Sequence, residues 1–269
     1  MVKSYKIALC QITPSMDKDE SVARAFSMIE KAASEGAVLI GLPEMFYSPL
    51  DLRHIRKICG NEEDILNECR NLAKRLGVYI CSGSMAYPEA QRIYNRSFLI
   101  DCNGRVVLSY SKTHLYDVNF RNFQVRESSL YTAGTGISTV ETELGRIGII
   151  ICYDIRFPEL LRHNAVLGAD LIIAPSVFNA VSGPAHWHVM MRARAIENQL
   201  FMAAISQGRN LDTFYKSYGH SMVVSPWGDI LSEADETEQI LYAQIDLQLI
   251  AETRAKLPLL QHRREELYH

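Results

Sequence analysis

Three residues with complementary chemistry each follow an apolar run of the chain. Glu44 follows "VLIGLP", Lys112 follows "VVLSYS", and Cys152 follows "IGIII". Reactive side chains at the carboxyl ends of buried strands are common at the sites of open α/β sheets. A carboxylate, a cation and a thiol suit acyl transfer, because the acid takes the thiol proton and the cation stabilises the oxyanion. The spacing alone is equally consistent with structural roles. Glu44 is then an acid in a turn, Lys112 a solvated residue at a strand end, and Cys152 a buried structural thiol.

Other arrangements of cysteine and histidine have less support. A thiol–imidazole pair lacks a local signature at each candidate histidine, namely His114, His163, His186, His188 and His220. The "HWH" segment suggests a metal, but residues two apart on a helix do not face each other, so we expect no metal site there. The six cysteines form no C-x-x-C pair, and we interpret the five besides Cys152 as structural thiols.

The elements that must position these residues alternate between helical and strand patterns. Helices are expected at 21–33, 61–77, 158–168 and 185–199, with a last one near Leu247. Strands are expected at 37–42, 78–86, 145–152, 169–176, 200–207, 220–231 and 240–247, with a tight turn at 227–229, and a hairpin is expected at 94–101 and 105–112. Hairpins between β-α units predict a single α/β domain over 1–269, with mixed sheets inside and helices outside.

Composition and charge exclude several classes of protein. The chain has 269 residues, with 28 Lys and Arg against 31 Asp and Glu, for a net charge of −3. Because the charges are mixed along the chain, we expect no nucleic-acid partner. No run approaches the roughly 18 apolar residues of a membrane helix. The N-terminal run Ile7–Cys10 is typical of a first strand rather than a signal peptide, so we expect a cytoplasmic protein without a membrane partner.

Around the three reactive residues, the sequence resembles the nitrilase superfamily of carbon–nitrogen hydrolases. The resemblance rests on "GLPEMF", "SKTHLYD" and "ICYDIRFPEL" in that order. It extends through "SVFNAVSGPAHW", "RARAIENQ", "YGHSMVVSPWGDIL" and "LPLLQHRREELY", and the segment 178–187 and the tail are most similar to the Nit branch. The resemblance implies a four-layer α-β-β-α sandwich and a homodimer or larger homo-oligomer, with the tail near 256–269 contacting a partner subunit. It implies no metal and no cofactor.

The resemblance also implies roles for individual residues. Glu44 is then the general base, Cys152 the nucleophile, and Lys112 with the backbone N–H of Tyr153 the oxyanion partners. Glu127 matches a second acid that holds the lysine. The implied activity is hydrolysis, through a thioester, of the terminal amide of a small carboxylate-bearing amide such as 2-oxoglutaramate, or of deaminated glutathione. An N-carbamoyl amidohydrolase, a nitrilase, and a silent homologue that acts as a binding partner stay open as alternatives.

Substrate recognition is less clearly marked in the sequence. Tyr47, Tyr116 and Phe178 border the family motifs, so we expect them to line the pocket, although core packing would also explain them. Arg156 is a candidate partner for a substrate carboxylate, and a structural ion pair with Asp154 or Glu159 is the competing interpretation. The loop at 119–126 lacks the Pro-Gly usual in the Nit branch and carries two Phe and two Arg instead. Substrate choice is therefore the property that transfers least safely from the family.

Overall fold

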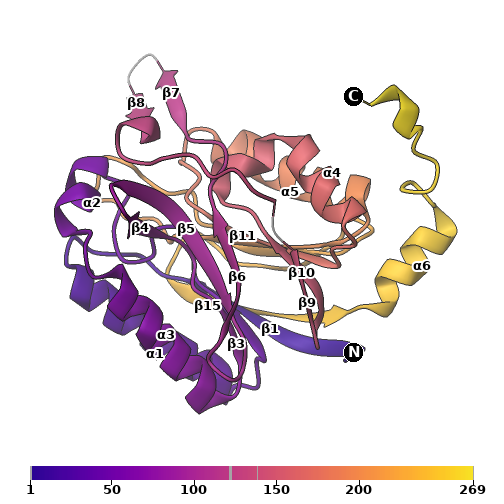
Figure 1. Ribbon diagram of the computed structural model, residues 1–269, viewed down its shortest axis with the longest axis horizontal. Helices are drawn as coiled ribbons and strands as arrows, with labels where there is room; N and C mark the ends of the chain where they lie inside the picture. Colours follow the sequence, from indigo (N-terminus) through magenta and orange to yellow (C-terminus); the bar gives the residue numbers. More distant parts are fainter. Residues whose placement is uncertain (1, 121–122, 138, 269) are drawn as a thin grey trace.

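A computed structural model describes residues 2–120, 123–137 and 139–268 of the chain, which form two large sheets between layers of helices (Figure 1). The first sheet is seven-stranded. Its order is β15 (Gln239–Asp246), β1 (Ser4–Gln11), β2 (Leu39–Gly41), β3 (Tyr79–Cys81), β5 (Arg92–Ile100) and β4 (Met85–Glu89), and β6 (Val106–Ser111) also pairs with β5.

The second sheet is six-stranded within the described residues. Its order is β14 (Ile230–Glu233), β13 (Met222–Val224), β12 (Phe201–Ser206), β11 (Leu171–Ser176), β10 (Gly145–Ile149) and β9 (Thr139–Thr142). Both sheets are mixed, because β1, β2 and β3 run parallel in the first and β10, β11 and β12 in the second, while their other neighbours are antiparallel.

The described helices are α1 (Lys18–Ser34), α2 (Leu52–Ile58), α3 (Glu62–Leu76), α4 (Pro158–Val166), α5 (Gly183–Asn198) and α6 (Gln248–Lys256). The helices α1 and α3 cover the outer face of the first sheet. In β1, Ala8 and Cys10 pack into the core under α1 and α3, whereas Ile7 and Leu9 pack into the core shared with the second sheet. Successive strand residues point to opposite faces, so one strand serves both cores. The other outer layer is α4 and α5 (Figure 1). The predicted α-β-β-α sandwich is thus confirmed.

The ends of the elements follow local chemistry. Asp17 caps α1 by accepting the N–H of Glu20, and Gly77 ends α3 in the left-handed region with φ 67°. Pro158 occupies the first turn of α4, as predicted. The predicted turn at 227–229 lies between β13 and β14.

Two segments differ from the prediction. The expected strand 78–86 is divided into β3 and β4, because Gly83 turns the chain with φ 66° and a Cβ there would lie 2.2 Å from the carbonyl oxygen of Pro43. The segment expected as a loop at 119–126 belongs instead to a hairpin of β7 (Asp117–Phe120) and β8 (Phe123–Arg126), whose ladder pairs Val118 with Val125. Positions 121 and 122 lie outside the described residues. The short elements α2 and β9 were also not predicted.

The described helices include none with the length and apolarity needed to cross a bilayer. After α6, the tail runs to a short 3-10 turn, Glu265–Leu267, that lies apart from the body of the molecule (Figure 1). A contact between this tail and a partner subunit stays a prediction.

Candidate active site

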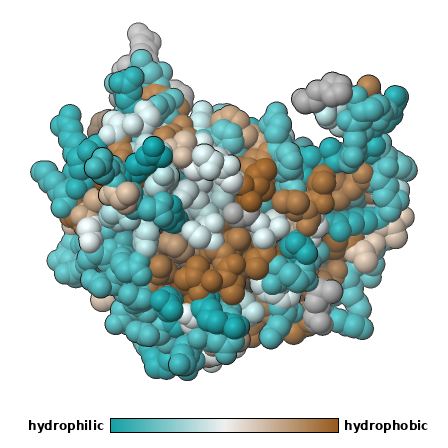
Figure 2. Space-filling model, in the orientation of Figure 1, coloured by the Kyte–Doolittle hydropathy of each residue, from teal (hydrophilic) through white to brown (hydrophobic). Residues whose placement is uncertain are grey.

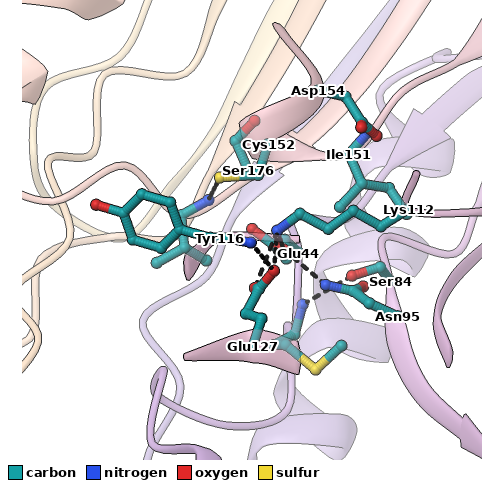
Figure 3. Close-up of polar contacts among 12 residues, drawn as sticks. Glu44, Ser84, Asn95, Lys112, Tyr116, Glu127, Ile151, Cys152, Asp154 and Ser176 are labelled. Carbon is teal, nitrogen blue, oxygen red and sulfur yellow. Dashed lines mark hydrogen bonds and ion pairs between the residues drawn. The ribbon is translucent and has the colours of Figure 1, made fainter. Parts of the chain in front are cut away.

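Lys112 lies between two carboxylates in the interior of the molecule (Figure 3). Its Nζ is 2.8 Å from Glu44 Oε1 and 2.9 Å from Glu127 Oε1, and all three side chains are buried. An ammonium has three N–H donors, so one bond to each acid leaves a third for another acceptor. The structure therefore brings together side chains from three separate segments of the chain in one buried cluster.

Glu44 follows β2 in a loop that is fixed from across the sandwich. The amide Nε2 of Gln207 lies 2.9 Å from the carbonyl oxygen of Glu44, 2.9 Å from that of Met45 and 3.0 Å from that of Ser48. Met45 has φ 47°, which is uncommon for a residue with a Cβ. The Glu44 carboxylate also accepts a hydrogen bond from Asn95 Nδ2 at 2.7 Å. Both its backbone and its side chain are thus held in place.

Cys152 follows β10 and begins the 3-10 turn Cys152–Arg156. Its φ of 46° lies in the left-handed region, which places the thiol at a sharp bend between strand and helix. The Sγ accepts a hydrogen bond from the backbone N–H of Val177 at 3.5 Å, just beyond β11 (Figure 3). Tyr153 is the second residue of the turn, where backbone N–H groups lack an intrahelical acceptor. Its N–H is therefore suited to the predicted oxyanion role.

The pKa shifts of Lys112, Glu127 and Cys152 follow from their burial and from the charges that surround each group. Burial disfavours the charge of Lys112, but Glu127 and Glu44 outweigh it and hold its pKa well above the ordinary value. Burial raises the pKa of Glu127 against the opposing charge of Lys112. Burial, followed by the Glu44 carboxylate, raises the pKa of the Cys152 thiol well above its ordinary value, although Lys112 opposes this. A thiol whose pKa is raised needs a base to form the reactive thiolate.

A small hollow with a cavity volume of about 10 Å³ opens at the thiol. Tyr116, Phe178 and Arg156 line it together with Cys152, as predicted. Tyr116 donates its N–H to Glu127 Oε2 at 2.7 Å, and its hydroxyl accepts a hydrogen bond from Asn179 Nδ2 at 3.2 Å. These bonds link the second acid directly to the wall of the hollow.

The Arg156 guanidinium lies over the ring of Phe178, 5.0 Å from its centroid, and 3.2 Å from Nδ1 of His186. Within the described residues, no carboxylate forms an ion pair with it. The competing interpretation of a structural ion pair with Asp154 or Glu159 is therefore wrong. A cation at a substrate hollow without a protein anion is free to bind an anionic ligand.

Tyr47 does not line the hollow, so its predicted contact with substrate is wrong. It lies in the core between α1, α3 and the first sheet. Its hydroxyl is 3.2 Å from Glu62 Oε1 and accepts the backbone N–H of Ala86 at 2.8 Å, while the ammonium of Lys18 lies over its ring. A buried tyrosine needs partners for its hydroxyl, and these satisfy it away from the thiol.

Sequence reasoning missed several groups that hold the site residues in place. Asn95 and Gln207 bind Glu44, and the backbone N–H of Val177 binds Cys152 Sγ. Asp154, predicted only as a partner of Arg156, instead accepts the backbone N–H of Ile151. Polar residues inside apolar strand patterns were a usable signal, because such side chains are buried only with partners. The competing thiol–imidazole pair has no counterpart, since no histidine of the described residues is hydrogen-bonded to Cys152. In "HWH", the two histidines diverge: His186 meets Arg156, and His188 meets Glu233.

Comparisons with known proteins identify the family. The model of the carbon–nitrogen hydrolase family matches residues 6–255, and the chain belongs to this family. It is 37% identical to omega-amidase NIT2 of Homo sapiens, over 98% of this chain and 97% of the relative. Nitrilase homolog 2 of Dictyostelium discoideum is 39% identical, over 99% of this chain and 82% of that protein. The resemblance to the Nit branch of the nitrilase superfamily is thereby confirmed.

The solved structures agree with this assignment. The crystal structure of the NitFhit protein of C. elegans superposes with a TM-score of 0.93 and 34% identity, over 100% of this chain and 67% of that chain. The fold and the family of this chain are therefore those of the carbon–nitrogen hydrolases.

Proposed function

We propose that this protein is an amidase that hydrolyses the terminal amide of a small, carboxylate-bearing amide to an acid and ammonia. The observation that carries the proposal is the buried Glu44–Lys112 pair beside the Cys152 thiol. A base, a cation and a nucleophile in one site are the parts that acyl transfer requires. A relative that is 37% identical is an omega-amidase, which supports this substrate class.

In the acylation step, Glu44 takes the thiol proton as Sγ of Cys152 forms a bond with the amide carbon. The oxyanion is held by the third N–H of Lys112 and the backbone N–H of Tyr153. Glu44 then gives its proton to the amide nitrogen, the C–N bond breaks, and ammonia leaves. A thioester on Cys152 is the product of this half-reaction.

In the second half-reaction, Glu44 deprotonates a water molecule as its oxygen attacks the thioester carbon. The same two donors hold the second oxyanion. The C–S bond then breaks, Cys152 regains its proton from Glu44, and the carboxylic acid is released. Glu127 stays bound to Lys112 and keeps its Nζ in place through both steps.

The position of Arg156 supports the choice of a substrate that carries a carboxylate at the end remote from the amide. It lines the same hollow as Cys152 and has no ion-pair partner among the described residues. The cavity volume of the hollow is about 10 Å³, which is room for roughly one water molecule, so a small substrate displaces its walls least. Small ω-amides such as 2-oxoglutaramate are therefore the first choice.

A second candidate substrate, deaminated glutathione, is favoured by a neighbouring groove. This groove has a volume of about 960 Å³, and Tyr215 borders both it and the hollow at the thiol. Arg53 and Arg126 line it together with Asp51 and Asp212, so charged partners of both signs are available to a longer substrate. A substrate that extends past Tyr215 would use both spaces.

The test is a release assay on a panel of substrates, comprising 2-oxoglutaramate, succinamate, deaminated glutathione, an N-carbamoyl amino acid and a nitrile. We expect ammonia and acid from the amides at the highest kcat/KM, and a thioester increment on Cys152 by mass spectrometry after rapid quench. Cys152→Ala should abolish turnover, and Cys59→Ala serves as the matched control away from the site. Carbon dioxide from the carbamoyl compound as the main product, or unchanged turnover in Cys152→Ala, would overturn the proposal.

We also propose that two copies associate. The end of α4 exposes Val166 and Leu167, and α5 exposes Val189 and Ile196. Figure 2 shows apolar residues gathered over the region of α4. Exposed apolar surface of this kind supports an interface, and the extended tail offers a second contact. Light scattering of the full chain and of a chain ending at 256 tests this. The cytoplasmic location stays a prediction.

A further inference from the structure

Three potential metal ligands converge on the outside of the second sheet, away from the thiol. His188 lies on α5, His220 precedes β13, and Glu233 ends β14. Nε2 of His188 is 2.6 Å from Glu233 Oε1, and Nδ1 of His220 is 3.2 Å from the same oxygen. One donor atom from each of the three residues lies within 4.8 Å of the others.

His220 is also held by contacts with residues outside the cluster. Trp187 donates its indole N–H to the carbonyl oxygen of His220, and the N–H of His220 is bonded to the carbonyl oxygen of Asp235 at 3.0 Å. The ring of Tyr218 packs on the ring of His220, with the centroids 4.3 Å apart. The histidine is therefore oriented before any ligand arrives.

From this geometry we propose that His188, His220 and Glu233 form a Zn²⁺ site. Imidazole nitrogen and carboxylate oxygen are both ligands of zinc, at about 2.0–2.2 Å, and three protein ligands leave a fourth position for water. Two imidazoles exclude magnesium and calcium as preferred ions, because those cations select oxygen ligands. Ligand atoms around a tetrahedral zinc lie about 3.3 Å apart, so the two contacts of the histidines with Glu233 need to lengthen by less than about 1 Å.

Charge and access also suit a cation. Glu233 supplies a negative charge, and Asp235 and Glu236 follow it in the chain. The three ligand side chains are 22–32% exposed, so an ion reaches them from solvent without opening the fold. Bound zinc would tie α5 to β14 and to the segment before β13. This role is structural and independent of the amidase proposal, because none of the three residues lines the hollow at Cys152.

His186 provides a matched control within the same helix. It lies two residues before His188, and its Nδ1 faces Arg156 rather than Glu233. A zinc site built from the "HWH" segment would lose affinity when His186 is changed, whereas the site proposed here would not. The control therefore separates a surface histidine pair from the cluster.

The experiment is equilibrium dialysis of EDTA-treated full-length protein against ZnCl₂, with the metal quantified by mass spectrometry. We expect one zinc per chain, a loss of affinity of more than about 100-fold in His188→Gln and in Glu233→Gln, and no loss in His186→Gln. Zinc should also raise Tm in the wild type and in His186→Gln, but not in the other two variants. Each variant's metal-free Tm shows whether it is folded.

Cobalt(II) distinguishes this cluster from a cysteine site. We expect the visible d–d bands of a tetrahedral nitrogen and oxygen site, without the thiolate charge-transfer band at shorter wavelength. Absence of stoichiometric zinc binding, a thiolate band, or unchanged affinity in His188→Gln and Glu233→Gln would each overturn the proposal. Ammonia release is not a readout here, so failure of the amidase proposal would leave this test intact.

Discussion

The carboxylate of Asp154 accepts the backbone N–H of His114 at 2.9 Å, and this bond joins the turn that carries Cys152 to the segment that follows Lys112. The same carboxylate accepts the hydroxyl of Tyr110 at 2.8 Å and the N–H of Ile151 at 3.0 Å. Nucleophile and cation come from different sheets, so their relative position depends on such a connection. Asp154 is thus a positioning residue that does not touch the reacting atoms.

Asp154→Asn should lower kcat more than it changes KM. The amide keeps one acceptor oxygen but presents an NH₂ to groups that donate, so one or two hydrogen bonds are lost. A hydrogen bond to a charged group contributes about 1.5–3 kcal/mol, so the loss of one such bond should lower kcat by roughly 10- to 150-fold. Steady-state kinetics check this, with Asp19→Asn on the exposed face of α1 as the matched control. A purely structural role would lower Tm and leave kcat of the folded fraction unchanged.

Glu44→Gln should remove the general base while keeping the site assembled. The side-chain oxygen of glutamine can still accept from Asn95 and Lys112, which both donate to Glu44 Oε1. General-base catalysis contributes about 10²–10⁴-fold, so kcat/KM should fall by that amount with Tm nearly unchanged. Glu68→Gln on exposed α3 is the control. Activity within about threefold of the wild type would remove Glu44 from the mechanism.

Lys112→Met should damage both turnover and stability. Loss of an oxyanion donor costs about 10²–10³-fold in kcat. It also leaves Glu44 and Glu127 buried without their cation, and breaking such a pair costs about 3–5 kcal/mol of unfolding free energy.

A double variant separates the two effects of Lys112. Adding Glu127→Gln should restore part of the stability, because one unpaired buried charge is removed, without restoring kcat. Urea unfolding and initial rates measure the two quantities, and Lys31→Met on the surface of α1 is the control. If the double variant were less stable than Lys112→Met, the charge argument would fail.

The alternation of strand and helix patterns predicted a mixed α/β domain with sheets inside and helices outside, and the resemblance to the nitrilase superfamily implied the four-layer sandwich. Apolar strands that end in Glu44, Lys112 and Cys152 marked these residues as candidates, and the resemblance implied their roles. Asn95 and Gln207 are different: each meets Glu44 from a distant element, and only the fold shows that contact. The left-handed φ of Cys152 was likewise not predictable, since thiols give no propensity for it.

The hairpin β7–β8 shows why some elements escape sequence reasoning. Its strands are four residues each and carry mixed polar and aromatic residues, so no period of two stands out.

Tyr47 was predicted to line the pocket because it follows a family motif in the sequence, but it lies in the core. A side chain that lies close in sequence to a site residue can point into the core where the chain bends. For Tyr47, only the hydrogen-bond partners of its hydroxyl show this.

Tyr47→Phe should lower stability and leave catalysis unchanged. It removes the hydroxyl that meets Glu62 and accepts the N–H of Ala86, and an unsatisfied buried group costs about 1–3 kcal/mol. Tyr116→Phe makes the matched comparison, because Tyr116 lines the hollow and bonds Asn179. We expect it to change KM more than Tm. Thermal unfolding and kcat/KM of both variants decide whether the assignments are right.

The pH dependence of Cys152 alkylation tests the charges around the nucleophile. Burial and then Glu44 raise the pKa of this thiol above its ordinary value of 9.0, and Lys112 opposes the rise. The thiolate is the alkylated form, so the rate should rise with pH through a midpoint above 9.0. Glu44→Gln removes a cause that raises the pKa and should shift the midpoint down; Lys112→Met removes one that lowers it and should shift the midpoint up.

Cys59 is an internal control for this experiment, because its raised pKa is caused by its own burial and Glu62. Its alkylation midpoint should not move in either variant. Iodoacetamide labelling followed by peptide mass spectrometry measures both cysteines in one sample. A midpoint for Cys152 below 9.0, or shifts in the same direction for both variants, would contradict the charge arrangement. Opposite shifts at Cys152 with none at Cys59 would show that Glu44 and Lys112 act on the thiol directly.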